Sequence, residues 1–357
     1  MVILGSTGSI GRNSLEIAER YNLDIETLVA GNNVTLLNKQ IQRFSPKIVV
    51  VGKKELASKV NHKNVLWGES GILQALEESK SQTVVNALVG FTGLKPTLKT
   101  LELGKKLALA NKESLVVAGA FLDVSKIHPI DSEHFALWYL LNGRKVERMT
   151  LTASGGALRD WDISKINLAK PEDVLKHPNW NMGNKITVDS ATMVNKIFEV
   201  LEAKWLFGID KIDGIIETSS TIHSFVEFID GSTTAHLSGT DMKLPIAFAL
   251  LDKVEERVLP PVDLMKMQNL EFREIEYNRY PIWLLKNHLL QNPKKGLIIN
   301  SANDFYVNKF LNKEISFGQI SKGIMNTFEK FDKFEPNSID EVFEIDSEIK
   351  KWLKNQN

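Results

Sequence analysis

Two carboxylates stand one residue apart in the chain, at Asp131 and Glu133, with Ser132 between them. In an extended chain the side chains at positions i and i+2 face the same way, so both carboxylates could reach one cation. The alternative is that they are ordinary acidic residues at the start of a helix, stabilised by the helix dipole. Taken on its own, the pair favours the second interpretation, acidic residues at the start of a helix.

A second polar group follows at Asn195, Lys196 and Glu199. In the long helix that we predict from about 187 to 207, these residues lie three and four positions apart and share roughly one face. Ser190, about a turn and a half earlier, adds a hydroxyl. A surface ion pair is the alternative interpretation.

The segment between these groups offers places for an anion. We expect 147–153 to be a strand, and the Ser154-Gly155-Gly156 that ends it offers a hydroxyl and free backbone N–H groups, a good phosphate nest. The loop His177-Pro-Asn-Trp180-Asn-Met-Gly183 could close over a ligand, although Trp180 could equally just pack the loop down. His223 lies in an alternating stretch, 222–228, where a core or hairpin histidine is the default.

The chain begins with a glycine-rich turn, Gly5-Ser-Thr-Gly-Ser-Ile-Gly11, between the apolar run 2–4 and a predicted helix over 13–21. Glycines let a backbone approach a pyrophosphate, and a helix N-terminus supplies free N–H donors. A tight strand-to-helix turn without a ligand is the alternative. The position of the turn after the first strand of an alternating chain favours a dinucleotide site.

The end of the second predicted strand indicates which nicotinamide would bind. An NAD site usually places Asp or Glu there to hold the ribose 2′-OH, but here the residues are Ala30-Gly31-Asn32-Asn33. With no carboxylate to repel a 2′-phosphate, we expect NADP. No Arg or Lys stands at that point either, and Arg12 and Lys39 are the nearest candidates.

The elements that must position these residues follow from the pattern of apolar runs. Runs at 25–30, 48–51, 84–89 and 107–110 predict buried parallel strands, and 35–44, 70–79 and 94–103 predict helices between them. This alternation predicts a doubly wound sheet. Beyond about residue 130 we predict a second α/β unit, with strands over 214–229 and 233–237 joined by an Asp230-Gly231 hairpin turn. After Pro281 only 297–299 has strand character, so a helical domain is expected.

Composition excludes several classes of protein. Lys+Arg and Asp+Glu both total 44, so no global charge attracts nucleic acid or an anionic membrane surface. The absence of cysteine excludes disulfides and thiolate metal sites and suits a reducing cytoplasm, where we expect the protein. No apolar run approaches the length of about 20 residues that spans a bilayer, and we expect no targeting segment before the first strand.

Taken together, these segments resemble the 1-deoxy-D-xylulose 5-phosphate reductoisomerase family. The motifs that carry the resemblance run in family order through nearly the whole chain: Gly5–Gly11, Ala110-Asn-Lys-Glu-Ser-Leu115, Pro129-Ile-Asp-Ser-Glu-His134, Ala153-Ser-Gly-Gly156, His177–Gly183, Val188-Asp-Ser-Ala-Thr-Met193, Asn195-Lys196, Glu199, Ile222-His-Ser224, and Asp241-Met242 with Pro245-Ile246. The resemblance implies an enzyme of the non-mevalonate isoprenoid pathway that uses NADPH and Mg²⁺ or Mn²⁺. It would convert 1-deoxy-D-xylulose 5-phosphate into 2-C-methyl-D-erythritol 4-phosphate.

The resemblance also implies an organisation of the chain. The fold class expected is α/β, with a Rossmann-type NADPH domain over 1–128, a central α/β catalytic domain with the dimer interface over 129–255, a linker over 256–283 and a C-terminal α-helical domain over 284–357. The family forms homodimers. Three carboxylates without Cys or His suit a hard ion with open positions, where the substrate's carbonyl and hydroxyl oxygens would bind.

The resemblance assigns roles residue by residue. Its metal ligands are Asp131, Glu133 and Glu199, which with Lys112 and His177 form the catalytic set. Its substrate contacts are Ser132, Ser154, His177, Trp180, Ser190, Asn195 and Lys196, four of which, Ser154, Ser190, Asn195 and Lys196, would hold the phosphate. Its cofactor contacts are Ser6, Thr7, Gly8, Ser9, Ile10, Gly31, Asn32, Asn33, Asn111, Lys112, Glu113, Met182, Gly183 and Met242.

The chain departs from the family pattern at three points. Glu217-Thr218-Ser219 stands where many relatives have His-Pro-Gln, Ala157 where a Pro often follows the glycine pair, and Asn32 where Lys is frequent. Two other functions stay open on the residues alone. One is an NADP-dependent dehydrogenase of similar architecture that needs no metal, such as one acting on an amino-acid semialdehyde. The other is a non-catalytic protein that binds or senses a dinucleotide.

Overall fold

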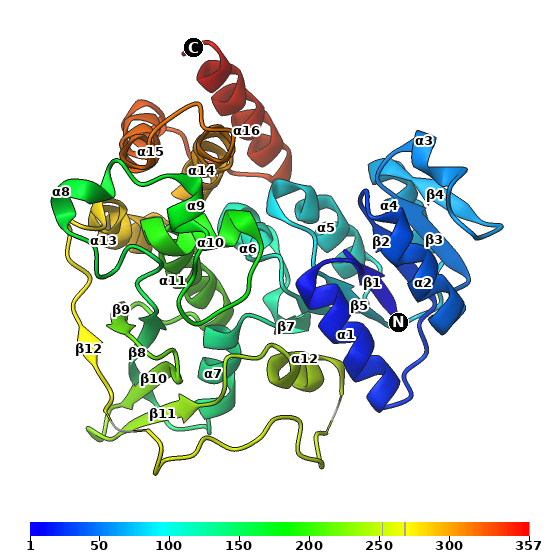
Figure 1. The fold of residues 1–357 in the computed structure, drawn as a ribbon, viewed down its shortest axis with the longest axis horizontal. Helices are drawn as coiled ribbons and strands as arrows, with labels where there is room; N and C mark the ends of the chain where they lie inside the picture. Colours follow the sequence, from blue (N-terminus) through cyan, green and yellow to red (C-terminus); the bar gives the residue numbers. More distant parts are fainter. Residues whose placement is uncertain (252, 268, 357) are drawn as a thin grey trace. The chain divides into compact units, whose positions relative to one another are not determined.

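The computed structural model describes residues 1–251, 253–267 and 269–356, which form two compact units (Figure 1). The first unit is built from Met1–Ser114, Leu122–Ser132 and Asp241–Leu259. The second is built from Leu115–Phe121, Glu133–Thr240 and Pro260–Asn357. The chain passes between the units several times, so each unit is assembled from segments far apart in the sequence.

The first unit contains a seven-stranded sheet in the order β4-β3-β2-β1-β5-β6-β7, and every strand pair in it is parallel. The order runs outward in both directions from β1 and β5, so the sheet is doubly wound, as predicted. The strands are β1 (Val2–Leu4), β2 (Thr27–Ala30), β3 (Ile48–Val51), β4 (Val65–Trp67), β5 (Thr83–Asn86), β6 (Lys106–Leu109) and β7 (Ile127–Pro129).

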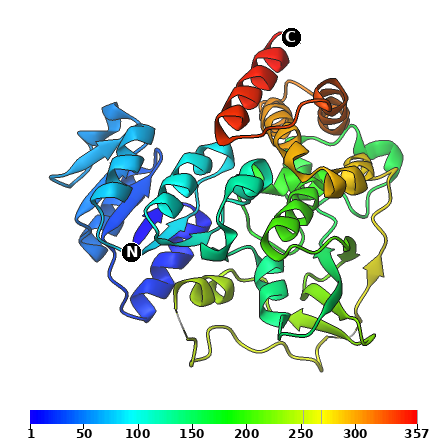
Figure 2. The ribbon, with the colours of Figure 1, turned by 180° about the vertical axis from the view of Figure 1, so that it is seen from behind.

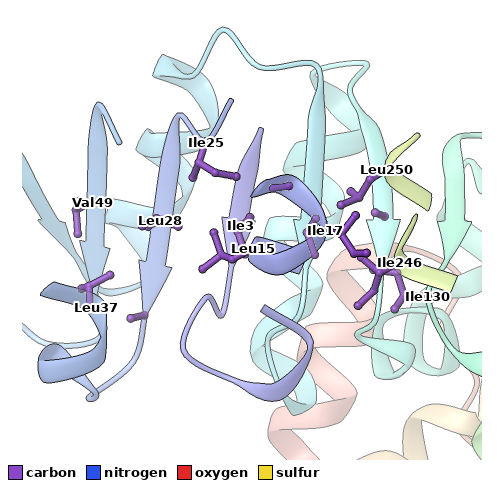
Figure 3. Packing of buried hydrophobic residues seen from close by; sticks show 14 of the residues in the cluster. Ile3, Leu15, Ile17, Ile25, Leu28, Leu37, Val49, Ile130, Ile246 and Leu250 are labelled. Carbon is purple, nitrogen blue, oxygen red and sulfur yellow. The ribbon is translucent and has the colours of Figure 1, made fainter. Parts of the chain in front are cut away.

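Helices cover both faces of this sheet, which is why its strands are apolar throughout instead of alternating. One face of the sheet carries Ile3, Leu28 and Val49. These side chains belong to the same buried cluster as Leu15 of the helix after β1 and Ile246 of the helix over Lys243–Leu250 (Figure 3). The helices and short 3₁₀ turns of the unit are α1 (Ser9–Arg20), α2 (Val34–Phe44), α3 (Lys54–Ala57), α4 (Gly68–Glu78), η1 (Gly90–Gly93), α5 (Leu94–Glu102), η3 (Val124–Lys126) and α12 (Lys243–Leu250). Two helices run from the first unit into the second, α6 (Lys112–Ala118) and α7 (Ser132–Leu140).

The second unit contains a five-stranded sheet in the order β11-β10-β8-β9-β12. Its strands are β8 (Val146–Ala153), β9 (Ile212–Glu217), β10 (Ile222–Phe228), β11 (Thr233–Leu237) and β12 (Phe272–Arg273). The hairpin at Asp230-Gly231 is confirmed, with Gly231 at φ +83°. The single run predicted over 214–229 is corrected to two strands, because the chain turns between Glu217 and Ile222.

The long helix predicted from about 187 to 207 is also corrected. It is two helices, α10 (Asn184–Thr192) and α11 (Val194–Phe207), separated at Met193, whose φ of +68° is left-handed. Met193 is 1% exposed, so its side chain belongs to the core while its backbone makes the break. Ser190 and Lys196 therefore lie on different helices. The other short helices here are η2 (Gly119–Phe121), α8 (Ile163–Ile166) and α9 (Pro171–Val174).

Residues after Pro281 are helical, as predicted, and the last three helices, in orange and red, gather at one end of the second unit (Figure 2). The elements are η4 (Pro281–Leu285), α13 (Lys286–Gln291), η5 (Pro293–Lys295), α14 (Gly296–Leu311), α15 (Phe317–Phe331) and α16 (Ile339–Lys354). The strand character noted at 297–299 belongs to the buried face of α14. The stretch predicted as a linker also has a structural part, because β12 extends the second sheet by pairing with β9. Over residues 1–251, 253–267 and 269–356, no helix has both the length and the apolarity needed to cross a membrane.

Candidate active site

The glycine turn after β1 makes close approaches that only glycine permits. Gly5 has φ +86°, and a Cβ there would stand 2.6 Å from the carbonyl oxygen of Ala87. A Cβ on Gly11 would stand 2.3 Å from the carbonyl oxygen of Gly5. Helix α1 begins directly behind the turn, with Gly8 as its N-cap and no side chain capping it. Its first N–H groups are therefore available to an anion, which fits a dinucleotide pyrophosphate.

The predicted cofactor residues beside this turn use some of their side chains for structure. The Ser6 hydroxyl donates to Oε1 of Gln40 at 2.8 Å, and Gln40 donates back to the Ser6 carbonyl at 2.8 Å. Asn33 caps α2 by accepting from the N–H of Leu36 at 3.1 Å. The Ser6 N–H also donates to the carbonyl of Val29 at 2.8 Å and Ser6 is fully buried, so this residue is engaged within the protein, whereas Asn33 is exposed. The other predicted cofactor residues of these turns are exposed or half-exposed: Thr7, Gly8, Ser9, Ile10, Gly31 and Asn32. The alternative cation candidates, Arg12 on α1 and Lys39 on α2, are exposed as well.

The turn that follows β6 carries Asn111, Lys112 and Glu113. The Asn111 amide donates to the carbonyls of Leu88 and Gly90, both at 2.9 Å, and Glu113 accepts from the N–H of Gly90 at 3.2 Å. These contacts join the ends of β5 and β6, so Asn111 and Glu113 shape the cofactor edge of the sheet. Lys112 turns elsewhere: its Nζ lies 2.5 Å from Oδ2 of Asp131, and both side chains are about nine-tenths buried.

The three predicted metal ligands come together. One carboxylate oxygen from each of Asp131, Glu133 and Glu199 lies within 4.8 Å of the other two. Asp131 follows β7, Glu133 is in the first turn of α7, and Glu199 is on α11 and 1% exposed. Three carboxylates crowded this closely repel one another unless cations balance them. Their oxygen-only chemistry fits Mg²⁺ or Mn²⁺.

Lys196 and Asn195 attach to this carboxylate group through Glu199. Lys196 Nζ donates to one Glu199 oxygen and lies 3.6 Å from Oε1 of Glu133, and Asn195 donates to the other Glu199 oxygen. Lys196 is only 3% exposed, so its charge acts at short range in a poorly hydrated place. The predicted common face of Asn195, Lys196 and Glu199 on one helix is confirmed, and the alternative of a solvent-exposed ion pair is excluded by their burial.

A second group that could hold a cation, Asp131 with His134 and Glu202, suits one less well. His134 Nε2 bonds the carbonyl oxygen of Glu199 at 2.8 Å, and its Nδ1 lies 3.3 Å from Oε2 of Glu202. His134 and Glu202 are 0% and 1% exposed. His134 thereby supports the backbone of Glu199. An ion held by these two buried side chains would be out of reach of a ligand from solvent, whereas Glu133 in the three-carboxylate group has a side chain that is 15% exposed.

Ser154, His177 and Ser190 meet in the second unit, although they come from three different elements. Ser154 Oγ lies 2.8 Å from His177 Nε2 and 3.3 Å from Ser190 Oγ, and Ser190 Oγ is 3.3 Å from the same ring nitrogen. The strand end brings Ser154, the loop brings His177, and α10 brings Ser190. A Cβ on Gly156 would stand 2.5 Å from Cα of Ala191, which is how α10 approaches the strand end so closely.

The hydrogen bonds of His177 define its tautomer. Its Nδ1 accepts from the backbone N–H of Asn179 at 3.2 Å and of Trp180 at 2.9 Å. The ring proton is therefore on Nε2, which donates to Ser154. Burial and the neighbouring positive charge of Arg159 lower the pKa of His177 to about 4. His177 is thus a neutral donor near pH 7, suited to orienting hydroxyls that bind a phosphate.

Several residues that the sequence did not single out hold this serine–histidine group in place. Arg159 Nη1 donates to the carbonyls of Ser154 at 2.8 Å and Thr218 at 2.9 Å. Asn179 Nδ2 also donates to the Thr218 carbonyl, at 2.9 Å. Arg159 stands five residues after Ser154 in the sequence. A positively charged residue so close to a predicted phosphate nest is the signal that could have identified Arg159 as part of the site.

The segment predicted as a linker supplies further support. Tyr280 is 2% exposed, and its hydroxyl donates to the carbonyl of Gly155 at 2.8 Å. Burial raises the pKa of Tyr280 to about 12, so the hydroxyl stays protonated and keeps donating. Arg279 Nη1 donates to the carbonyls of Leu158 at 3.1 Å and Trp161 at 2.9 Å. Arg279 and Tyr280 therefore stabilise the loop after Ser154 through hydrogen bonds to its carbonyls.

Trp180 lies against His223, with ring centroids 6.0 Å apart and the planes inclined by 57°. The His223 ring also lies near the His236 ring, and the two ring centroids are 6.0 Å apart. His223 is 2% exposed, which confirms the core histidine expected by default. Trp180 itself is half-exposed, as are Ser132, Met182 and Met242, whereas Gly183 is exposed. Met182 and Gly183 belong to the second unit and Met242 to the first.

Comparison with known proteins adds to this geometry. Family models described as 1-deoxy-D-xylulose 5-phosphate reductoisomerase, its C-terminal domain, and DXP reductoisomerase C-terminal domain match residues 1–119, 127–207 and 237–352. The chain is 58% identical over 362 residues to the 1-deoxy-D-xylulose 5-phosphate reductoisomerase of Nautilia profundicola, with 99% of each chain covered. The chain belongs to the 1-deoxy-D-xylulose 5-phosphate reductoisomerase family.

Other members of the family agree in sequence and in fold. The reductoisomerase of Wolinella succinogenes is 49% identical, again over 99% of both chains. A solved DOX-P reductoisomerase in complex with NADPH, fosmidomycin and magnesium superposes with a TM-score of 0.91 at 30% identity, covering 99% of this chain and 97% of that one. The Zymomonas mobilis enzyme in complex with NADPH gives a TM-score of 0.88 at 31% identity, with the same coverage. The resemblance stated from the motifs is thereby confirmed.

Proposed function

We propose that this protein isomerises and reduces 1-deoxy-D-xylulose 5-phosphate to 2-C-methyl-D-erythritol 4-phosphate, using NADPH and Mg²⁺ or Mn²⁺. The observation that carries the proposal is the three-carboxylate group of Asp131, Glu133 and Glu199, within 4.8 Å, in a chain that also has a dinucleotide-type glycine turn. A dehydrogenase that needs no metal, or a protein that only binds a dinucleotide, has no use for such a group.

The carboxylates would hold the ion, and Lys112 and Lys196 would balance their charge. A bound Mg²⁺ or Mn²⁺ supplies a Lewis acid that stabilises negative charge on the substrate's neighbouring oxygens while the carbon skeleton rearranges. Bound NADPH supplies the hydride that reduces the aldehyde formed. Around these groups the chain's own task is to fix the substrate's orientation and keep water away.

The phosphate is assigned to Ser154, Ser190, Asn195 and Lys196, with His177 orienting the serines. Two hydroxyls at 3.3 Å from each other, beside a neutral histidine that donates from Nε2, form a suitable anion site. Fixing the remote phosphate fixes the reacting end, and Trp180 would cover it. Thr7, Gly8, Ser9 and Ile10 are assigned to the NADPH pyrophosphate, and Asn32 with Arg12 or Lys39 to its 2′-phosphate.

The proposal includes a homodimer and a cytoplasmic location. Family likeness supports the dimer, and so do Trp138 and Tyr139 of α7, whose exposed fractions of 45% and 53% are high for large aromatic residues in a single chain. The absence of cysteine supports a reducing compartment. Light scattering of the purified protein measures the oligomeric state directly, and a monomer at micromolar concentration would refute that part.

The function is tested by following NADPH oxidation with 1-deoxy-D-xylulose 5-phosphate, with and without Mg²⁺ or Mn²⁺, and identifying the product. Metal-dependent oxidation that yields the branched polyol phosphate establishes the function. Equal oxidation in the presence of a chelator points to a metal-independent dehydrogenase. Tight NADPH binding without oxidation points to a sensing protein.

A further inference from the structure

Glu217 stands at a point where the chain departs from its family, and the structure gives it a specific task. It is the last residue of β9, is 0% exposed, and accepts four hydrogen bonds. Oε1 accepts from the N–H and the hydroxyl of Ser219 at 2.8 and 2.7 Å. Oε2 accepts from the N–H groups of Thr221 at 2.8 Å and Ile222 at 3.1 Å. The carboxylate thus organises the whole turn from β9 to β10, the 217–222 loop.

This arrangement requires a side chain whose two terminal atoms both accept hydrogen bonds. Backbone N–H groups can only donate, and they approach both oxygens of Glu217. The loop also contains a strained residue, because Ser220 has φ +57°. A buried carboxylate that binds three N–H groups is a strong enough template to hold such a turn in one shape.

The shaped loop in turn holds the base of the Trp180 loop. Asn179 Nδ2 donates to the Thr218 carbonyl at 2.9 Å and to the Ser220 hydroxyl at 2.8 Å. Asn179 and Trp180 also donate their backbone N–H groups to His177 Nδ1. A shift of the 217–222 loop would therefore move Asn179, the N–H groups that fix the His177 tautomer, and the start of the segment that carries Trp180.

The same loop also reaches the strand end. The Thr218 carbonyl accepts from Arg159, and the same Arg159 nitrogen donates to the Ser154 carbonyl. Two connections, one through Asn179 and one through Arg159, thus lead to the group formed by Ser154, His177 and Ser190. Both begin at the carbonyl of Thr218, whose position the Glu217 carboxylate determines.

We propose that Glu217 is a positioning residue, which fixes the substrate-phosphate site and the base of the Trp180 loop through the 217–222 loop. The inference rests on the proposed function for what the site binds.

The test compares Glu217→Gln with Glu271→Gln. The first substitution would turn an amide NH₂ group toward N–H donors, whereas Glu271 touches the same loop from solvent, accepting from the Thr218 hydroxyl at 3.2 Å with its side chain 53% exposed. For Glu217→Gln we expect the KM for 1-deoxy-D-xylulose 5-phosphate to rise about tenfold, with a smaller change in kcat and unchanged NADPH affinity. Glu271→Gln should match the wild type. An unchanged KM in Glu217→Gln overturns the inference.

Hydrogen exchange measures the loop itself and separates this inference from the proposed function. Glu217→Gln should speed amide exchange in 217–222 and in 177–180, and Asn179→Ala, which keeps the Glu217 contacts, should speed it only in 177–180. If the wild type does not turn over the substrate, the proposed function fails while these exchange patterns still test the positioning. Exchange in 177–180 that stays at the wild-type rate in both variants overturns it.

Discussion

At the scale of single residues, the site combines charges that would be unstable apart. Glu199 accepts from Lys196 and Asn195, and all three are held on one helix a turn apart. Removing one partner of a buried ion pair leaves the other charge without compensation, which costs several kcal/mol. Lys112 and Lys196 beside the carboxylates therefore balance part of their negative charge.

We expect Glu199→Gln to abolish turnover by weakening the metal site. Metal affinity should fall by at least about 100-fold, the upper range seen when only a supporting residue of a metal ligand is lost. The measurements are turnover across a Mn²⁺ titration and NADPH affinity by fluorescence. NADPH binding should be largely kept, and an equal loss of cofactor affinity would contradict this division of roles.

Lys196→Ala should mainly raise the substrate KM. The lost ammonium group is assigned to the phosphate, and binding made equally in ground and transition states appears in KM. Steady-state kinetics at saturating Mg²⁺ measures this. Because Lys196 also donates a hydrogen bond to Glu199, the dependence of the variant's activity on metal concentration is measured as well. A changed metal requirement with an unchanged KM would move the phosphate site elsewhere.

At the scale of elements, the site depends on where strands and helices end. β8 ends at Ala153 and α10 passes directly over the following glycines. Gly155 and Gly156 both have positive φ, at +81° and +72°, so the backbone can turn beneath Ser190. The break at Met193 then redirects the chain into α11, which carries Asn195, Lys196 and Glu199. Because the chain is divided into two helices here, Ser190 lies on α10 beside Ser154 and His177, and Glu199 lies on α11 beside Asp131 and Glu133.

The close approach at Gly156 gives a test of this packing. Gly156→Ala would place a Cβ 2.5 Å from Ala191, in addition to the strain of its positive φ. We expect unfolding to be easier by about 1–3 kcal/mol and the substrate KM to rise as Ser190 shifts. Gly231→Ala is the matched control, since its φ is +83° but nothing lies within 4 Å of the added Cβ. If Gly231→Ala raised KM as much as Gly156→Ala, backbone strain alone would explain both variants.

At the scale of the whole molecule, two partly buried titratable groups in different units give stability a distinct pH dependence. In the second unit, His177 has a folded pKa of about 4, below the usual 6.5, so protons favour the unfolded chain as pH falls from about 6.5 to 4. In the first unit, burial alone would raise the pKa of Glu26, but hydrogen bonds from Ser79 and Ser81 outweigh it and lower the pKa to about 2. The stabilisation from Glu26 is complete above about pH 4.5 and is lost as pH falls toward 2.

We therefore expect stability to decline in two separable steps on acidification. His177→Gln should flatten the decline between pH 6.5 and 4, and Glu26→Gln should flatten the decline between 4.5 and 2, each by about 1–3 kcal/mol. Urea unfolding at a series of pH values measures both. Because the residues are in different units, their effects should add in the double variant. A wild type whose unfolding free energy is constant from pH 6.5 to 4 would contradict the burial of His177 as a neutral ring.

Several features of the fold and of the site follow from local patterns in the sequence. Apolar runs separated by helical segments predicted the parallel sheet because strands covered on both faces need apolar residues throughout. The glycine turn predicted its own geometry, since Gly5 and Gly11 allow no Cβ. The spacing of Asn195, Lys196 and Glu199 predicted their shared face, and the ordered motifs predicted the family.

The tertiary structure alone decided what depends on distant partners. Met193 carries no signal in the sequence that marks a helix break, yet its backbone is left-handed, with φ +68°, and its side chain is buried. Arg159 and the Thr218 carbonyl are 59 positions apart, and Asn179 is 39 positions from the same carbonyl. In the sequence, Glu217 is only a departure from a family motif. In the folded chain it is buried, and its carboxylate accepts hydrogen bonds from three backbone N–H groups. Hydrogen bonds between segments far apart in the chain leave no spacing to detect, so their geometry becomes visible only once the chain has folded.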